Sequence, residues 1–347
     1  MYWAGVLLAF LGLDLDVGYY FHLVKGQANL LWNREPIERV LKQSDLDPEI
    51  RKQLLFIQEV KAFAQQQIGL VPSQTYSSFV DLHGQPVSWN LTACPKDRLD
   101  PVRWSYPVVG SAPYRGYFDL KRAKKERDAL EAKGYDTYLR SVSAYSTLGW
   151  FSDPVLSSML HYRDADLASL VIHEMTHATV WIPGDINFNE SLASFVGDAG
   201  AILFFKSKFG PDAQVVRDVL IGAEDNRVFR RFMKAFAASL DSLYATDLTF
   251  DKKIQEREAV FDHAKKIFRT LPLKTKAFQN FTDWKMNNAR MVLYRIYNEE
   301  VNLFEQIYEA QDRDLIGSLD VFKGCEDAGD PANYLKDWLE KKKGDIP

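Results

Sequence analysis

The sequence carries one pattern with strong chemical potential, HEMTH at residues 173–177, inside an apolar stretch. On a helix, residues four apart share a face, so His173 and His177 can reach one metal ion through neutral imidazoles. Glu174 follows the first histidine, where its carboxylate can take a proton from a water molecule that the metal activates. Two core histidines flanking a glutamate are the structural alternative, but burying an unpaired carboxylate is costly. The pattern therefore predicts a zinc site, with one Zn²⁺ per chain.

A catalytic zinc site needs a third protein ligand, and Glu190 is the best candidate downstream. It belongs to NESLASFVGDAGA, a stretch with helical apolar spacing that follows the short reversal GDINFN. Two helices joined in this way can pack antiparallel, which would bring Glu190 against the two histidines. Asp198 lies about two turns later on a similar face, and we expect it to orient a ligand histidine. Asp185, beside Gly184, is interpreted as a turn residue.

Peptide hydrolysis also needs a donor for the developing oxyanion, and Tyr145 and Tyr297 are candidates. Tyr145 belongs to AYSTL (144–148), on a predicted strand that leads into the histidine helix. Such a strand can pair with an extended substrate through Ala144 and Ser146. An ordinary sheet strand and core tyrosines are the structural alternatives.

Two further residues are candidates for substrate binding. Arg115, in PYRGYF (113–118), could hold a substrate carboxylate, although the segment is also typical of a structured turn. Asn288 lies beside Asn287 on the predicted helix of Tyr297.

The chain is predicted to be an α+β protein, with a small mixed sheet beside a large helical body. Residues 26–347 are expected to form a single catalytic unit. Within it, residues 31–74 have the apolar spacing of helices, and residues 75–160 are rich in the aromatic, β-branched, Gly and Pro residues typical of strands and turns. Residues 161–347 are expected to be helical and to carry the zinc site.

Helix ends are also marked in the sequence. Asp164 or Asp166 can cap the start of the histidine helix, and Pro183–Gly184 is expected to end it. Residues 118–134 are predicted to form a helix closed by Gly134. Its basic run KRAKKER is interrupted and flanked by acidic residues, so it is interpreted as a solvated helix face.

Bulk composition narrows the class of protein. Apolar residues make up 46% of the chain and charged residues 26%, which favours a packed core over disorder. The net charge of −4 gives no reason to expect a nucleic-acid partner. Cys94 and Cys325 are far apart and could either pair or both stay free.

Residues 1–25 are treated as a separate N-terminal apolar segment. MYWAGVLLAFLGL is too short to span a bilayer, which takes about 20 residues, but it fits the apolar region of a secretory signal. A buried N-terminal helix is the alternative. We expect export or membrane association through this segment.

The order of motifs resembles a known group of enzymes. HEMTH followed by FNESLASFVGDAG resembles the gluzincin-type zinc metallopeptidases, in which a glutamate on the next helix is the third ligand. GYY (18–20), PVVGSAPYRGYFD (107–119), VSAYSTLGWFSDPVLSSML (142–160) and NNARMVLYRIY (287–297) extend the resemblance to the bacterial putative aminopeptidase family. It implies a zincin-like fold with zinc carried by His173, His177 and Glu190, and with Glu174 as the base.

The sequence also departs from these families. Ser194 stands where many gluzincins have an acidic residue, so Asp198 would have to substitute. Family members often begin as lipoproteins, whereas no cysteine precedes Cys94. No acidic anchor for a substrate amine is identified, which leaves both exopeptidase and endopeptidase activity open.

The sequence therefore predicts a zinc-dependent metallopeptidase, an aminopeptidase-like hydrolase with a peptide substrate. We expect it in the cell envelope or periplasm of a bacterium, with a cytoplasmic location left open. The alternative function is a zinc-binding envelope scaffold or regulatory protein that does not turn over peptides.

Overall fold

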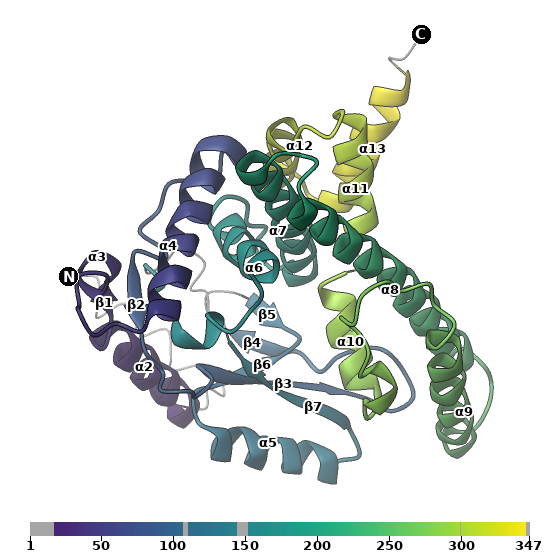
Figure 1. Ribbon diagram of the computed structural model, residues 1–347. Helices are drawn as coiled ribbons and strands as arrows, with labels where there is room; N and C mark the ends of the chain where they lie inside the picture. The colour runs from purple at the N-terminus through teal and green to yellow at the C-terminus, as the bar shows by residue number, and fades with distance from the viewer. Residues whose placement is uncertain (1–16, 107–109, 144–151, 299, 345–347) are drawn as a thin grey trace.

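The computed structural model describes residues 17–106, 110–143, 152–298 and 300–344 (Figure 1). Within these ranges, no helix combines the length and the apolar character that crossing a membrane requires. The apolar run at the N-terminus and the AYSTL segment, with Ala144, Tyr145 and Ser146, lie outside the described residues. The expected boundary after residue 25 falls inside helix α2 (Val17–Trp32), which continues without a break across it.

The sheet that positions the site has three antiparallel strands in the order β6-β3-β7. Asn90 of β3 is paired with Arg140 of β7, and Ser88 with Val142. Residues paired in this way point to the same face of a sheet, because side chains alternate along each strand. This face therefore presents polar groups, whereas Leu91 on the other face packs in a separate apolar cluster. The three strands are β3 (Ser88–Cys94), β6 (Arg115–Tyr117) and β7 (Asp136–Val142).

Two smaller sheets accompany this one, so the single mixed sheet that the sequence predicts is divided among three. One is mixed, because β2 pairs antiparallel with β1 and parallel with β8. The other has two antiparallel strands. Their strands are β1 (Glu35–Pro36), β2 (Ser78–Val80) and β8 (Val155–Leu156), and β4 (Trp104–Tyr106) with β5 (Gly110–Ala112).

Helix α5 (Leu120–Ala132) covers the apolar face of the β6-β3-β7 sheet, and α6, α7 and α10 lie on its other side (Figure 1). Most basic side chains of α5 are exposed, as expected for a solvated face. Gly134 follows the C-cap Lys133 with a φ of 88°, a left-handed conformation that glycine adopts without strain.

The helical body makes up most of the remaining chain and confirms the expected α+β class. Its largest core packs α4, α6, α7 and α11 to α13 together, and a second core lies between α8 and α9. Cys325 in the large core and Cys94 at the end of β3 are both buried and form no disulfide bond. The helices are α3 (Ile37–Val40), α4 (Pro48–Phe63, followed by a π-helical turn Ala64–Ile68), α6 (Asp164–His177), α7 (Ile186–Phe209), α8 (Gln214–Tyr244), α9 (Phe250–Phe268), α10 (Asn288–Ile296), α11 (Val301–Ala310), α12 (Leu315–Lys323) and α13 (Pro331–Gly344), with short 3₁₀ turns at Ser157–Met159, Phe281–Asp283 and Gly324–Asp327.

The ends of α6 differ from the sequence-based prediction. Its N-cap is Arg163, and no side chain caps it. Asp166 instead forms an ion pair with Arg163 at 2.7 Å, and Asp164 is already the first helical residue. The helix ends at His177, well before Pro183, because the chain must turn there to bring α7 alongside.

Helices α6 and α7 approach each other closely at two glycines of α7. A Cβ atom on Gly197 would lie 2.7 Å from the carbonyl oxygen of Ser169 and 3.2 Å from the Cβ of His173. A Cβ on Gly200 would lie 3.0 Å from the Cδ1 of Ile172 in α6, and 2.8 Å from the Cδ1 of Ile68 in the π-helical turn after α4. Only glycine leaves room for α7 to lie this close to the helix that carries both histidines.

We expect Gly197→Ala to lower the free energy of unfolding by about 1–3 kcal/mol, because the added methyl overpacks the contact between α6 and α7. Gly222→Ala on α8 is the matched control, since nothing lies within 4 Å of the added methyl. That control should gain roughly 0.5–1 kcal/mol from helix propensity. Urea denaturation measures both, and equal gains in the two variants would contradict the close approach.

Candidate metal centre and its cavity

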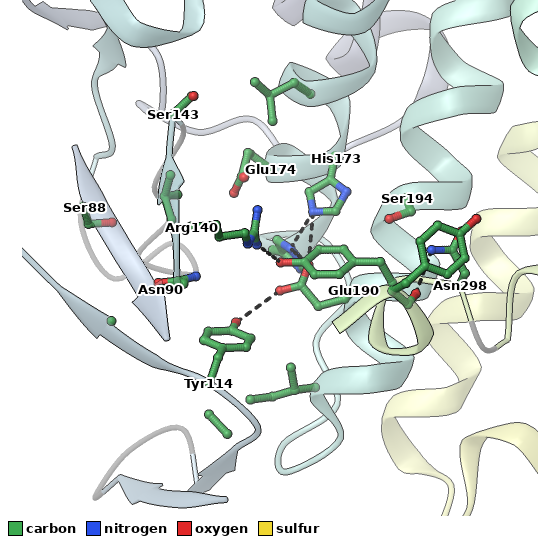
Figure 2. Close-up of a pocket in the computed structure, with 18 of the residues that line it drawn as sticks. Ser88, Asn90, Tyr114, Arg140, Ser143, His173, Glu174, Glu190, Ser194 and Asn298 are labelled. Atoms are coloured by element: carbon green, nitrogen blue, oxygen red, sulfur yellow. Dashed lines mark hydrogen bonds and ion pairs between the residues drawn. The ribbon is translucent and has the colours of Figure 1, made fainter. Parts of the chain in front are cut away.

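His173, His177 and Glu190 meet between α6 and α7 (Figure 2). The Nε2 atoms of the histidines lie 3.2 Å apart, and the Oε2 of Glu190 lies 3.4 Å from Nε2 of His173 and 3.8 Å from Nε2 of His177. Two ligands of a tetrahedral zinc ion, each about 2.0–2.1 Å from it, lie about 3.3 Å apart. The three atoms therefore fit three corners of a tetrahedral metal site.

The protonation of these groups follows from their burial and from one another. Burial alone would raise the pKa of Glu190, but the hydrogen bond with His173 and the nearby histidines hold it below its usual value. Burial lowers the pKa of His177 to about 4. Burial acts in the same direction on His173, yet Glu190 and the neighbouring carboxylates raise its pKa above the usual value. Glu190 is thus ionised and His177 neutral at pH 7, and His173 takes up a proton more readily than an ordinary histidine.

Three consecutive residues of α7 fix the position of this centre. The side chain of Asn189 accepts a hydrogen bond from the amide of Ile182 and donates one to its carbonyl oxygen, both at 2.8 Å, which holds the loop after α6. Glu190 faces the histidines. The hydroxyl of Ser191 donates to the carbonyl oxygen of Ile296 at 3.1 Å, which fixes the end of α10.

The side chains around the centre orient its members. The hydroxyl of Tyr114 donates to Oε1 of Glu190 at 3.4 Å, leaving Oε2 toward the histidines. Burial, followed by the charge of Glu190, raises the pKa of Tyr114 well above its usual value, so the hydroxyl keeps its proton. The ring of Trp181 packs edge-on against His177 with centroids 5.7 Å apart. Nδ1 of His177 is buried without a hydrogen-bond partner in the described part of the chain.

The centre opens into a cavity of about 690 Å³. Glu174 lines it beside His173, and Arg140 faces it from β7 (Figure 2). The ring of Tyr297, just after α10, stacks over that of His173 with centroids 6.5 Å apart and planes 25° apart. Its hydroxyl accepts a hydrogen bond from Nη2 of Arg140 at 3.2 Å. Burial, with help from Glu190, raises the pKa of Tyr297, so it too is a neutral donor.

Asp198 lies close to the centre, but its partner is not the expected histidine. Its Oδ1 accepts from the hydroxyl of Ser169 at 2.9 Å, and no hydrogen bond joins it to either histidine among the described residues. It influences the centre through its charge, which contributes to the raised pKa of His173.

Asn288, a predicted substrate-binding residue, is not among the residues that line the cavity. It is fully buried, its Nδ2 donates to the carbonyl oxygens of Pro95 and Arg98, and its Oδ1 accepts from Tyr244. The backbone N–H of Asn288 also donates a hydrogen bond to Oδ2 of Asp136. All these groups serve to attach α10 to α8 and to the end of the sheet.

Arg115 is likewise not placed to bind substrate. Its guanidinium lies over the ring of Tyr19, 3.9 Å from the centroid, and forms an ion pair with Glu126 of α5 at 3.6 Å. Arg115 does not line the cavity, although its neighbour Gly116 does. The alternation of β6 directs the Arg115 side chain toward α2 and α5 instead.

Sequence reasoning missed four residues of the site: Tyr114, Arg140, Asn189 and Ser191. Arg140 had a detectable signal, because it is the one basic residue within the predicted strand YDTYLRSV. Asn189 and Ser191 flank Glu190 in the motif but gave no separate indication of their contacts.

A family model described as "Putative aminopeptidase" matches residues 18–328. The chain belongs to this family. No curated protein and no solved structure matches it. The description of the family implies a hydrolase that acts on peptides, and the matched region contains both the cavity and the three clustered ligands.

Metal affinity should fall as the pH falls, because protons compete with the metal for the histidines. Because the pKa of His173 is raised, protons should begin to compete with the metal at a higher pH than they would at an ordinary histidine. Protonation of His177 should contribute only near pH 4. Below the pKa of His173 we expect roughly a tenfold loss of affinity per pH unit. Zinc titrations against a competing chelator between pH 5 and 8 measure this. An affinity that does not change with pH would contradict binding through His173.

Proposed function

We propose that the protein is a zinc-dependent metallopeptidase of the gluzincin type, with a zincin-like arrangement of its active-site helix. The observation that carries the proposal is the spacing of His173, His177 and Glu190, with Glu174 beside them in the same cavity. Two imidazole nitrogens and one carboxylate oxygen are a ligand set typical of catalytic zinc, and they are less suited to calcium or magnesium. The family description supports a peptide substrate.

His173, His177 and Glu190 would hold the ion. Bound there, zinc would activate a water molecule and polarise the peptide carbonyl. Glu174 is placed next to the first ligand, where it can take the proton of the attacking water and return it to the leaving amine. Tyr114 keeps Oε1 of Glu190 engaged, so that Oε2 serves the metal.

Tyr297 is the proposed donor to the oxyanion. Its oxygen already accepts a hydrogen bond from Arg140, so its own proton is available to another acceptor. Its stacking on His173 holds the hydroxyl beside the metal ligands. The raised pKa keeps the proton in place at neutral pH.

We expect Glu174→Gln to bind about one zinc per chain and to lose roughly 10²–10⁴-fold in kcat, because it removes the base without removing a ligand. Glu190→Gln is the matched control and should lose zinc as well as activity. Elemental mass spectrometry and a peptide-library assay measure the two properties. Full turnover by Glu174→Gln would refute the role of this residue, and a zinc-loaded wild type that cleaves no peptide would favour the scaffold function.

Tyr297→Phe should lower kcat by about 10²–10³-fold with little change in KM, because the lost hydrogen bond forms in the transition state. Tyr294→Phe serves as the control, because Tyr294 lies in the last turn of α10, just before Tyr297, and also lines the cavity. Steady-state kinetics with one good peptide substrate test both. An unchanged kcat in Tyr297→Phe would assign the oxyanion to another donor.

A further inference from the structure

Arg140 is a largely buried cation without an anionic partner. Its guanidinium donates to the hydroxyl of Tyr297, and its Nε is buried without any hydrogen-bond partner. No carboxylate lies within ion-pair distance of it in the part of the chain that the structure describes. A guanidinium has five donors and stays charged at physiological pH. Burying a charged guanidinium without an anionic partner lowers the stability of the fold, which points to a partner that arrives with the substrate.

The location of Arg140 restricts what that partner can be. The pairing of β3 and β7 directs Arg140 to the cavity face together with Asn90 and Ser88, and all three line the cavity. The side chain reaches toward the centre from the sheet, opposite the helix that carries His173 (Figure 2). A group bound to Arg140 would therefore lie beside the peptide bond that the metal centre attacks.

The carboxylates near the cavity have closer partners than Arg140, although its charge helps to lower the pKa of Glu190. The two positive charges of a divalent metal ion would be offset by Glu174 and Glu190. Asp198 is close to Arg230, and Asp166 is paired with Arg163 at 2.7 Å. None of these carboxylates forms an ion pair with Arg140 among the described residues, so its guanidinium is available to an anionic group of the substrate.

We propose that Arg140 binds a carboxylate of the peptide substrate, so that the enzyme prefers a free carboxylate next to the cleaved bond. A guanidinium can bind a carboxylate through two parallel hydrogen bonds, which favours this group over a neutral amide. The inference rests on the proposed peptidase function and deepens it. It assigns recognition to the carboxyl end of a short peptide, or to an acidic side chain at the same place, and not to the amine.

The acidic residues of the cavity also favour recognition of a substrate carboxylate over recognition of a substrate amine. A substrate ammonium needs an acidic partner, yet Glu190 is a metal ligand, Glu174 is the base, and Asp198 and Asp166 have partners of their own. Among the described residues that line the cavity, no other carboxylate is present.

The test measures binding without turnover, in zinc-loaded Glu174→Gln. Dissociation constants are determined by calorimetry for one tripeptide, its C-terminal amide, its N-acetyl form, and a C-terminal amide with glutamate as the last residue. We expect the amide to bind about tenfold or more weakly than the free acid, since a charge-assisted hydrogen bond is lost. N-acetylation should have little effect. If the glutamate-containing amide binds as tightly as the free acid, Arg140 recognises an acidic side chain. If that amide binds as weakly as the plain amide, Arg140 recognises the C-terminal carboxylate.

When Arg140→Gln is added to Glu174→Gln, the affinity for the free acid should fall to that for the amide. The affinity for the amide should not change. Arg230→Gln is the matched control, because Arg230 lines the same cavity but already pairs with Glu305 at 3.5 Å, and it should keep the preference. Zinc content and circular dichroism check that each variant is folded.

If Glu174→Gln binds the free acid and the amide with equal affinity, the proposal is overturned, and no Arg140 variant is needed to show it. A preference that survives Arg140→Gln, or binding lost only on N-acetylation, would overturn it too. A wild-type protein without zinc or turnover would instead refute the peptidase function, since the affinity ratio does not depend on hydrolysis.

Discussion

The close contact between α6 and α7 is the constraint on which the site depends. Glycine at 197 lets the second helix approach the backbone of Ser169 and the Cβ of His173, and glycine at 200 lets it approach the side chain of Ile172. Larger residues would separate the two helices, and the carboxylate of Glu190 would move away from the two imidazoles. The distances among the three ligand atoms, all within 4.8 Å, are therefore set by helix packing and not by a flexible loop. The packing of the two helices by itself thus brings the three candidate ligands together.

Successive residues on a helix point in directions about 100° apart. The Asn189–Glu190–Ser191 stretch uses this property to join three parts of the protein. Asn189 secures the loop from α6, Glu190 faces the histidines, and Ser191 binds the last carbonyl oxygen of α10. Because Tyr297 follows that carbonyl directly, one turn of α7 fixes the position of the candidate metal ligands and of the proposed oxyanion donor together.

The cavity is formed where two different surfaces meet. The helices supply the candidate metal ligands and Glu174, and the polar face of the β6-β3-β7 sheet supplies Arg140 and Asn90. The hydrogen bond between Arg140 and Tyr297 connects the two surfaces. Burying a guanidinium with so few partners opposes folding, and a peptide carboxylate would compensate for it. The same side chain would thus help to select the substrate and to orient the hydroxyl beside the metal.

The sequence by itself determined the pair of histidines, because spacing along one helix is a local property. It also determined the glutamate after the first histidine, the α+β class and the family. Glu190 could be proposed from the short connection between two helices. The roles of Arg115, Asn288 and Arg140 could not be obtained in this way. Strand register decides which face a side chain occupies, so Arg140 reaches the cavity while Arg115 points away. Only the tertiary structure, through this register and the contact of α6 with α7, decided which polar residues share the cavity.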